Sequence, residues 1–490
     1  MFQRRVVLSP DHGADGALLR EAFARIRTEM EVPGEFPAAV REEAREAASV
    51  THTRSVLNGQ LPDETAVPFV TIDPAGSMDL DQALHIEREG RGYRVRYAIA
   101  HVPAFVTPGG AVDAEARRRG ETIYMPDGSE PLHPRELSEG AASLLPGEVR
   151  PAFIWDIHLD DAGEIREAQV REAVARSVQR FDYEGAQADV AAGRGAAASD
   201  GPLALLREVG ERRIALEHAR GGASLPKPEQ EVVPTERGYR LRFRPPVPVE
   251  DWNAQISLMT GMAAARMMLD GRVGILRTMP SPSSAEVETF RLRATALGVP
   301  WPAGVRYGDF LRGLDRNDPH HLALMHAATS LFRGAGYTPF DGDVPDKREH
   351  AALAAPYAHV TAPLRRLVDR FALVTCAALC AGTPVPEWVR EALPSLPEVL
   401  RASGRLGSAV TRACTDAVEA AVLEPLVGTD FDASVVEERD DSVTVQITEP
   451  AVLTRVAGTA SAGQQVVVRL RAVDVPARKT SFEMAEAGDG

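Results

Sequence analysis

A run of β-prone residues over positions 67–72 leads directly into an acidic loop, and this junction constrains the fold more than any other feature of the chain. Asp73 ends the run, and Asp79 and Asp81 follow after a segment rich in turn-forming residues. Residues two apart in an extended segment face the same side, so Asp79 and Asp81 are expected to point together. Carboxylates that converge repel one another unless a cation lies among them. Their oxygens suit Mg²⁺ or Mn²⁺, which predicts a metal site for phosphodiester hydrolysis; a solvated turn is the alternative.

A second segment with chemical potential lies near residue 360. Pro363 fits the first turn of a helix, with Thr361 as a cap just ahead of it. Arg365 and Arg366 then fall in that first turn. The free N–H groups of a helix start and two guanidinium groups together predict a phosphate-binding site. A capped helix with a solvated basic turn is the alternative.

These two segments resemble signatures of the ribonuclease II family of 3′→5′ exoribonucleases, whose catalytic unit is the RNB domain. Residues 71–84 resemble the family's TID-x5-D-x-DDAL, and residues 357–370 resemble its Y-x-H-x-TSPIRRY-x-D. Between them, residues 124–138 are similar to YLP…LPxELS, and residues 143–151 match the next landmark. The motifs occur in family order, and the resemblance covers roughly residues 68–423. It implies a processive, hydrolytic exoribonuclease that degrades single-stranded RNA to nucleoside 5′-monophosphates.

The resemblance also implies a metal site and a catalytic pair. The metal group it implies is Asp73, Asp79, Asp81 and Gln82. Asp81 corresponds to the acid most critical for turnover, and Arg365 to the arginine that orients the scissile phosphate. Gln82 is a departure, because the family has a fourth acid there. The amide oxygen can still ligate a metal, but one negative charge is lost, which leaves the number of metal ions open. Mg²⁺ is the expected cofactor, with Mn²⁺ as a substitute.

Further residues are implied to contact RNA. They are Tyr124, which matches a tyrosine that packs against the 3′ nucleotide, together with Arg366, Tyr357 and His359. Ala362 and Leu367 depart from the family's Ser and Tyr. A phenylalanine that clamps the last base in some members is replaced within residues 279–283, so the second wall of the clamp has no assignment.

Composition is compatible with an RNA partner only through local charge. The net charge of -15 argues against broad nucleic-acid binding, but a channel that admits one strand needs only local positive lining. The arginines at 117–119 are candidates for that lining, or else a solvated helix face. The differing residues, Gln82 above all, motivate one rival function, a catalytically weak RNA-binding protein that retains the fold. A metal phosphodiesterase for small nucleotides is a second rival.

The pattern along the chain predicts an α+β multidomain protein. Residues 1–65 read as a helical N-terminal module, either helix-turn-helix-like or packed on the next domain. Residues 66–424 are expected to form the catalytic domain, with a mixed sheet early (strands at 93–101 and 152–159) and many helices later, including 364–381. For residues 425–490 the pattern predicts a five-stranded OB-fold barrel, with strands at 433–437, 442–447, 466–475 and 480–484. The resemblance to the family implies that this barrel binds RNA.

Cellular context follows from three cysteines and from hydropathy. Cys376, Cys380 and Cys414 show no metal-ligand spacing and suit a reducing cytoplasm. The first ten residues lack the apolar core of a signal peptide, and the longest apolar stretch, 371–382, is too short to span a bilayer. We expect a cytoplasmic monomer that does not bind a membrane.

Overall fold

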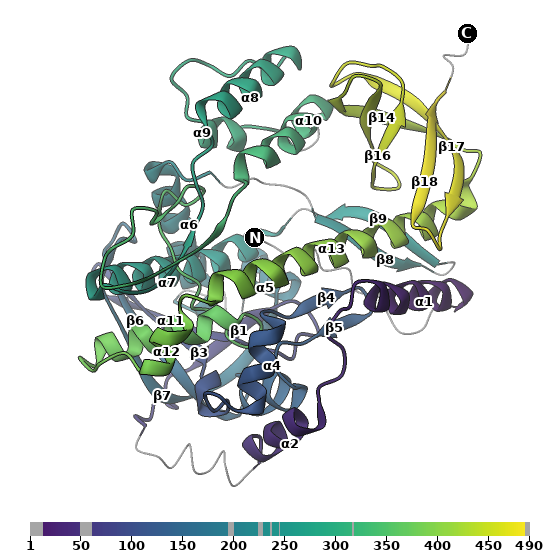
Figure 1. The fold of residues 1–490 in the computed structure, drawn as a ribbon. Helices are drawn as coiled ribbons and strands as arrows, with labels where there is room; N and C mark the ends of the chain where they lie inside the picture. Colours follow the sequence, from purple (N-terminus) through teal and green to yellow (C-terminus); the bar gives the residue numbers. More distant parts are fainter. Residues whose placement is uncertain are drawn as a thin grey trace.

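The fold places two β-barrels at opposite ends of a helical middle (Figure 1). The computed structural model describes residues 13–49, 61–194, 200–223, 229–235, 238–244, 246–315 and 318–485. The predicted α+β class is confirmed. No helix in these described ranges is both long and apolar enough to cross a membrane.

The first barrel closes the mixed sheet that the sequence predicts. Its strands, in barrel order, are β1 (Phe69–Asp73), β2 (Gln82–Glu89), β3 (Gly92–Ala100), β6 (Val149–Leu159) and β7 (Ile165–Asp182). Only the β7–β1 pairing is parallel. Because β1 and β2 pair antiparallel, the end of β1 and the start of β2 lie at the same end of the barrel, and the acidic loop joins them.

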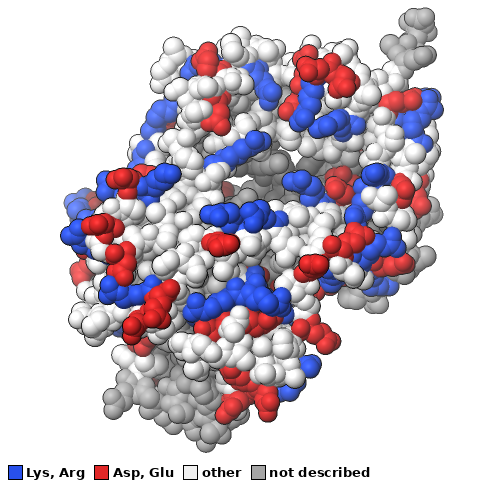
Figure 2. All heavy atoms as spheres, in the orientation of Figure 1, with Lys and Arg blue, Asp and Glu red and all other residues white. Residues whose placement is uncertain are grey.

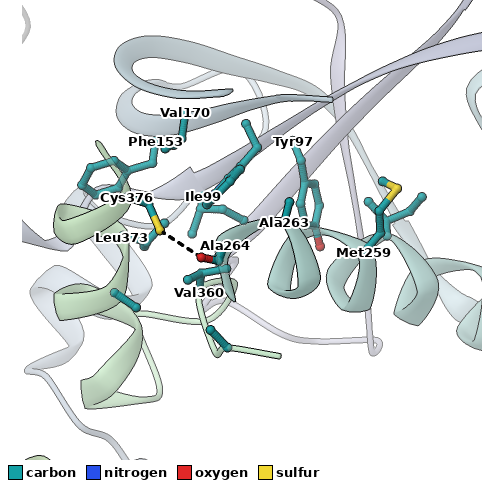
Figure 3. Packing of buried hydrophobic residues seen from close by; sticks show 14 of the residues in the cluster. Tyr97, Ile99, Phe153, Val170, Met259, Ala263, Ala264, Val360, Leu373 and Cys376 are labelled. Carbon is teal, nitrogen blue, oxygen red and sulfur yellow. Dashed lines mark hydrogen bonds between the residues drawn. The ribbon is translucent and has the colours of Figure 1, made fainter. Parts of the chain in front are cut away.

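Helices cover this barrel and fill the space beside β3. The main ones are α6 (Pro202–Arg220), α7 (Pro248–Gly271) and α11 (Leu367–Cys380). Figure 3 shows Ala264 of α7 next to Cys376 of α11, and Met259 of the same helix beyond Tyr97 of β3; all four belong to one buried apolar cluster. The Cys376 thiol lies 3.8 Å from the Ala264 carbonyl oxygen, which marks how closely the two helices approach. This packing fixes α11 against the barrel just beyond the arginine segment.

A long helix, α13 (Leu396–Leu423), runs from the catalytic core to the second barrel (Figure 1). Helix α1 (Gly13–Glu29) packs along it, with Phe23 and Ile26 buried in the same apolar cluster as Val410. Helix α2 (Ala38–Ala47) packs elsewhere, against α4 (Ala111–Arg119). The two N-terminal helices therefore attach to different parts of the body; a helix-turn-helix role for the module stays a prediction.

The C-terminal barrel has the five strands expected of an OB-fold. They are β14 (Asp430–Glu438), β15 (Ser442–Ile447), β16 (Val452–Ala457), β18 (Lys479–Met484) and β17 (Gln465–Asp474), in barrel order. Strand β16 is absent from the sequence prediction because its residue types do not alternate: burial alternates along it, but apolar Leu453 is exposed and polar Thr454 lies on the covered side.

Shorter elements connect these units. The helices are α5 (Tyr183–Ala192), α8 (Ser284–Ala296), α9 (Tyr307–Arg312), α10 (Pro319–Ala328) and α12 (Glu387–Ala392), with single turns at Val102–Ala104, Leu137–Ala141, Thr329–Phe332 and Glu424–Leu426. The strands are β4 (Ile123–Met125), β5 (Gly128–Glu130), β8 (Glu229–Thr235), β9 (Gly238–Arg244), β10 (Val273–Thr278), β11 (Gly336–Asp341), β12 (Glu349–His350) and β13 (Ala355–Pro356).

Candidate active site

The acidic loop between β1 and β2 is held by backbone and hydroxyl hydrogen bonds. The Ser143 hydroxyl accepts from the Leu80 N–H at 3.0 Å and donates to the Met78 carbonyl at 2.6 Å. The Leu80 carbonyl accepts from the Leu144 N–H at 3.0 Å, and the Asp81 carbonyl accepts from the Ala100 N–H at 2.9 Å. The predicted acids therefore sit on a loop fixed at several points, as a preorganised site requires.

Asp81 is the most buried of these acids, at 2% exposure. Its Oδ1 accepts a hydrogen bond from the Leu364 N–H at 2.7 Å, and its Oδ2 lies 3.5 Å from Nε of Arg365. Oδ2 has no hydrogen-bond partner within the described part of the chain. Burial raises the pKa of Asp81 well above its usual range, although the Arg365 charge opposes the shift. The two predicted catalytic residues are thus brought together.

The arginine segment is not the helix start that the sequence predicts. Helix α11 begins at Leu367, and Arg366 just before it is extended, with φ -132° and ψ 124°. A β-bridge between Glu121 and Arg366 holds this conformation, because the Arg365 carbonyl accepts from the Thr122 N–H at 2.9 Å. The predicted helix start at Pro363 is therefore wrong, because pairing with a distant strand overrides the local cap signal. Arg366 is instead the N-cap residue of α11, and a phosphate site at this helix N-terminus stays a prediction.

Asp369 binds the side chain of one of the two arginines and leaves the other arginine available to a ligand. Its carboxylate accepts two hydrogen bonds from Arg366, at 2.9 and 2.7 Å, and a third from the Ala362 N–H at 2.7 Å. This arrangement commits the Arg366 guanidinium to an internal carboxylate. Arg365 remains 44% exposed at its side chain and faces Asp81. Sequence reasoning gave Asp369 no role, although its place three residues after Arg366, at the start of a helix, was the available signal.

Gln82 joins the two motifs directly. Its amide nitrogen donates to the Thr361 carbonyl, so the residue in the family's fourth acid position ties the acidic loop to the arginine segment. Its amide oxygen makes no hydrogen bond to any other described residue. A carboxylate at this position could not donate, so this contact depends on the amide.

The remaining predicted acids differ in their surroundings. Asp79 accepts a hydrogen bond from the Tyr124 hydroxyl at 3.0 Å, and its charge contributes to the raised pKa of Asp81. Asp73 ends β1; burial, followed by the charge of Asp73, raises the pKa of Tyr183 to about 12. Asp79 thus lies close enough to Asp81 to affect its pKa, whereas Asp73 lies close enough to Tyr183 to affect the pKa of that residue.

The positions of these acidic side chains determine how the site can bind a divalent cation. No group of three or more acidic, histidine or cysteine side chains in the described ranges is arranged to hold a metal ion. The buried, unpartnered Oδ2 of Asp81 is nevertheless a hard oxygen atom without a donor. Mg²⁺ is commonly held by only one or two carboxylates and completes its shell with water and substrate phosphate oxygens. The residues present fit that mode of binding, and they do not form an all-protein cage.

The predicted RNA contacts Tyr357 and His359 lie in a cluster of rings. Tyr357 is 8% exposed, and its ring centre lies 5.5 Å from that of His359 and 5.9 Å from that of His350. Nδ1 of His359 is 2.8 Å from the Tyr337 hydroxyl. Burial, helped by the charge of Arg366, holds the pKa of His359 well below its usual range. The rings therefore meet edge to face and form a largely buried, uncharged cluster close enough to Arg366 for its charge to act on His359.

His133 is a further residue at the site that the sequence did not single out. Its Nδ1 lies 3.2 Å from the Leu364 carbonyl, so a neutral ring donates there. Burial lowers the pKa of His133 to about 4. Leu364 is consequently held on both sides, by Asp81 at its N–H and by His133 at its carbonyl.

Comparison with known proteins identifies the family of this chain. Residues 62–377 match the family described as RNB domain, and residues 429–485 match the RNase II-type exonuclease C-terminal S1 domain. Ribonuclease R of Escherichia coli (strain K12) is 27% identical over 362 residues, which cover 69% of this chain and 42% of that protein. The chain thus spans less than half the length of that relative.

Solved structures show the same fold. Mycoplasma genitalium RNase R superposes with a TM-score of 0.85 at 17% identity, covering 95% of this chain and 78% of that one. Yeast Ssd1, described as a pseudonuclease, superposes with a TM-score of 0.67 at 18% identity, covering 86% of this chain and 54% of that one. Because the RNB match extends over well more than half of the sequence, the chain belongs to the RNB-domain family of ribonuclease II-type proteins.

Proposed function

We propose that this protein is a divalent-metal-dependent 3′→5′ exoribonuclease that degrades single-stranded RNA processively and releases nucleoside 5′-monophosphates. The observation that carries the proposal is the approach of Arg365 to Asp81, 3.5 Å between Nε and Oδ2, from motifs at opposite ends of the catalytic region. Membership of the RNB family and the relatives named ribonuclease R support the reaction class.

In the proposed reaction, the protein residues mainly position the substrate and stabilise charge, and they do little covalent chemistry. In this proposal the exposed side chain of Arg365 holds the scissile phosphate and stabilises the charge that develops on it, which its 44% exposure supports. Oδ2 of Asp81, which has no hydrogen-bond donor among the described residues, accepts a hydrogen bond from the attacking water and orients it. Tyr124, which donates to Asp79, packs against the 3′-terminal nucleotide. Arg366 supports the segment through Asp369 and adds positive potential for a neighbouring phosphate.

The proposed metal ligands are the oxygens of the acidic loop. We assign them to Asp73, Asp79, Asp81 and the free amide oxygen of Gln82, with Mg²⁺ as the ion and Mn²⁺ as a substitute. When bound, such an ion polarises the phosphate and lowers the pKa of water. Tyr357 and His359 are proposed to contact RNA only at the edge of their ring cluster, because most of their surface is covered.

A second candidate is a catalytically weak RNA-binding protein. The observation that favours it is the amide of Gln82 bound to Thr361 where the family's fourth acid would stand. The fold alone does not decide, since a pseudonuclease shares it.

One assay separates the two candidates. Oligo(A) labelled at its 5′ end is incubated with the protein and Mg²⁺ or Mn²⁺, with excess unlabelled RNA added after the start to test processivity. The exoribonuclease predicts shortening from the 3′ end, nucleoside 5′-monophosphate as the product, and continued shortening after the trap. Binding of the oligonucleotide without shortening in either metal would reject the enzyme and favour the second candidate.

We further propose a cytoplasmic monomer divided into a helical module (1–65), a catalytic domain (66–424) and an RNA-binding OB-fold (425–490). The free state of Cys376, Cys380 and Cys414 supports a reducing compartment. The separate closure of the two barrels supports the division between the last two parts.

A further inference from the structure

One face of α13 carries a row of arginines that the proposed active site does not use. Arg401, Arg405 and Arg412 are all exposed. At about 100° per residue the three lie within an arc of about 40°, and at about 1.5 Å per residue the row is roughly 16 Å long. Ser408, also exposed, occupies the gap in the row. The arginines therefore form a straight line along the helix.

Among the residues whose side chains the structure describes, no acid pairs with these arginines. No carboxylate of a described residue lies within 4.0 Å of any of the three. The arginines at 117–119, which the sequence suggested as RNA lining, are by contrast paired with acids. Their partners are Asp113 and Glu115, and Arg119 is 4% exposed. Like charges four residues apart cost a helix about 0.2–0.5 kcal/mol. In a chain of net charge -15, an uncompensated cationic row indicates an anionic partner.

The surroundings leave the row accessible. Between the arginines the exposed positions are short side chains, Ala402 and Ala409. Acids flank the row at its two ends, where Glu398 is exposed and Asp416 is partly buried. Figure 2 shows basic side chains gathered across the middle of the face along which α13 runs in Figure 1.

The helix α13 itself passes close to the active site with its buried face, and the row lies on the opposite, exposed face. A Cβ placed on Gly407 would lie 3.4 Å from the carboxylate of Glu121, and Glu121 is the residue bridged to Arg366. At its other end the helix contacts β18 of the C-terminal barrel. The buried face of the helix is anchored by Val410 and Cys414 in the apolar core. The row thus lies on a rigid support between the arginine segment and the barrel.

We propose that Arg401, Arg405 and Arg412 bind consecutive backbone phosphates of RNA that lies outside the active site, between the catalytic domain and the C-terminal barrel. This inference rests on the proposed RNA substrate. Guanidinium groups match phosphate oxygens in geometry as well as charge. The exposed positions between the arginines include no aromatic residue for base stacking, so the contact is independent of base sequence.

The test compares RNAs that do and do not reach the row. Equilibrium binding of oligo(A) of 5 and of 25 nucleotides is measured across a salt series, in an Asp81→Asn background that spares the RNA. The test variant carries R401Q, R405Q and R412Q. The control carries R91Q, R166Q and R207Q, which removes the same charge from exposed arginines of the first barrel and α6. Matching melting temperatures show that both variants are folded.

The test variant should lose at least about tenfold in affinity for the 25-mer at low salt. Its slope of log K against log salt should become less negative by about 2, since each lost contact to a single strand contributes about 0.7. Its affinity for the 5-mer, and both affinities of the control, should stay unchanged. An unchanged slope, or equal losses for both lengths or both variants, overturns the proposal. Loss of long-RNA binding in a protein whose parent never cleaves RNA would retain this inference and reject the exoribonuclease.

Discussion

Replacement of Gln82 by glutamate should slow RNA cleavage, even though it restores a carboxylate to the metal group. The two side chains have the same length and shape. The amide nitrogen of Gln82 donates to the Thr361 carbonyl, whereas a glutamate oxygen at that place can only accept. Two acceptors would then face each other across the contact that joins the two motifs.

The magnitude follows from burial of the partner. Thr361 is 4% exposed, so its carbonyl cannot easily exchange the lost bond for water. A buried polar group left without its partner costs about 1–3 kcal/mol. A new carboxylate near Asp81, whose pKa burial already raises, adds repulsion of the same sign. If about 2 kcal/mol of this cost falls on the transition state, because Thr361 precedes the segment that carries Arg365, the rate drops roughly 30-fold.

The assay is single-turnover cleavage of 5′-labelled oligo(A) over a Mg²⁺ titration. Gln82→Met is the matched control, because it has similar length but neither donor nor charge. Both variants should show a lower plateau rate, and the glutamate variant should be the slower at low Mg²⁺. A glutamate variant that reaches the wild-type plateau at a lower Mg²⁺ concentration would refute the reasoning. That result would make Gln82 chiefly a weakened metal ligand.

Three further outcomes are expected. Asp81→Asn should abolish cleavage and keep RNA affinity, because it is nearly isosteric and leaves the phosphate contacts intact; a cleavage assay paired with gel shifts checks this, and near-normal turnover contradicts it. Arg365→Ala should cost about 2.7–4 kcal/mol in the chemical step with a much smaller loss of affinity, so equal losses in single-turnover rate and Kd would reduce Arg365 to a phosphate anchor. His133 stays neutral in the folded protein down to a pKa of about 4, whereas its ordinary value is 6.5; only the unfolded chain gains a proton between these values, so stability falls as pH drops through that window, by about 3 kcal/mol at its end. His133→Asn, which can still donate to Leu364, should flatten the dependence of melting temperature on pH between 7 and 4, and parallel curves would contradict the assignment.

Most strands and the charged residues of the site could be predicted from the sequence, because both depend on local pattern. Alternation located β3 and β6, and the acidic loop followed from an apolar run that ends in Asp73. Strand β16 was not predicted, because its apolar and polar residues do not follow its alternating burial. Local signals also predicted a helix start at Pro363, and this prediction was wrong. The β-bridge between Glu121 and Arg366 keeps the segment extended, and it joins residues far apart in the chain.

The geometry of the site could not be predicted, because it depends on which distant groups share hydrogen bonds. Three such bonds converge on the arginine segment: Gln82 at the Thr361 carbonyl, Asp369 at the Ala362 N–H and Asp81 at the Leu364 N–H. Each anchors a different residue of one short loop. The direction of the Arg365 side chain therefore follows from these three contacts before it and from the hydrogen bond that the Leu367 N–H donates to the Gly120 carbonyl after it. It follows that a change at Gln82 or Asp369 acts on the same geometric variable, the distance between the Arg365 guanidinium and Asp81. Their effects on cleavage should then be strongly non-additive, as expected for residues that share one structural element.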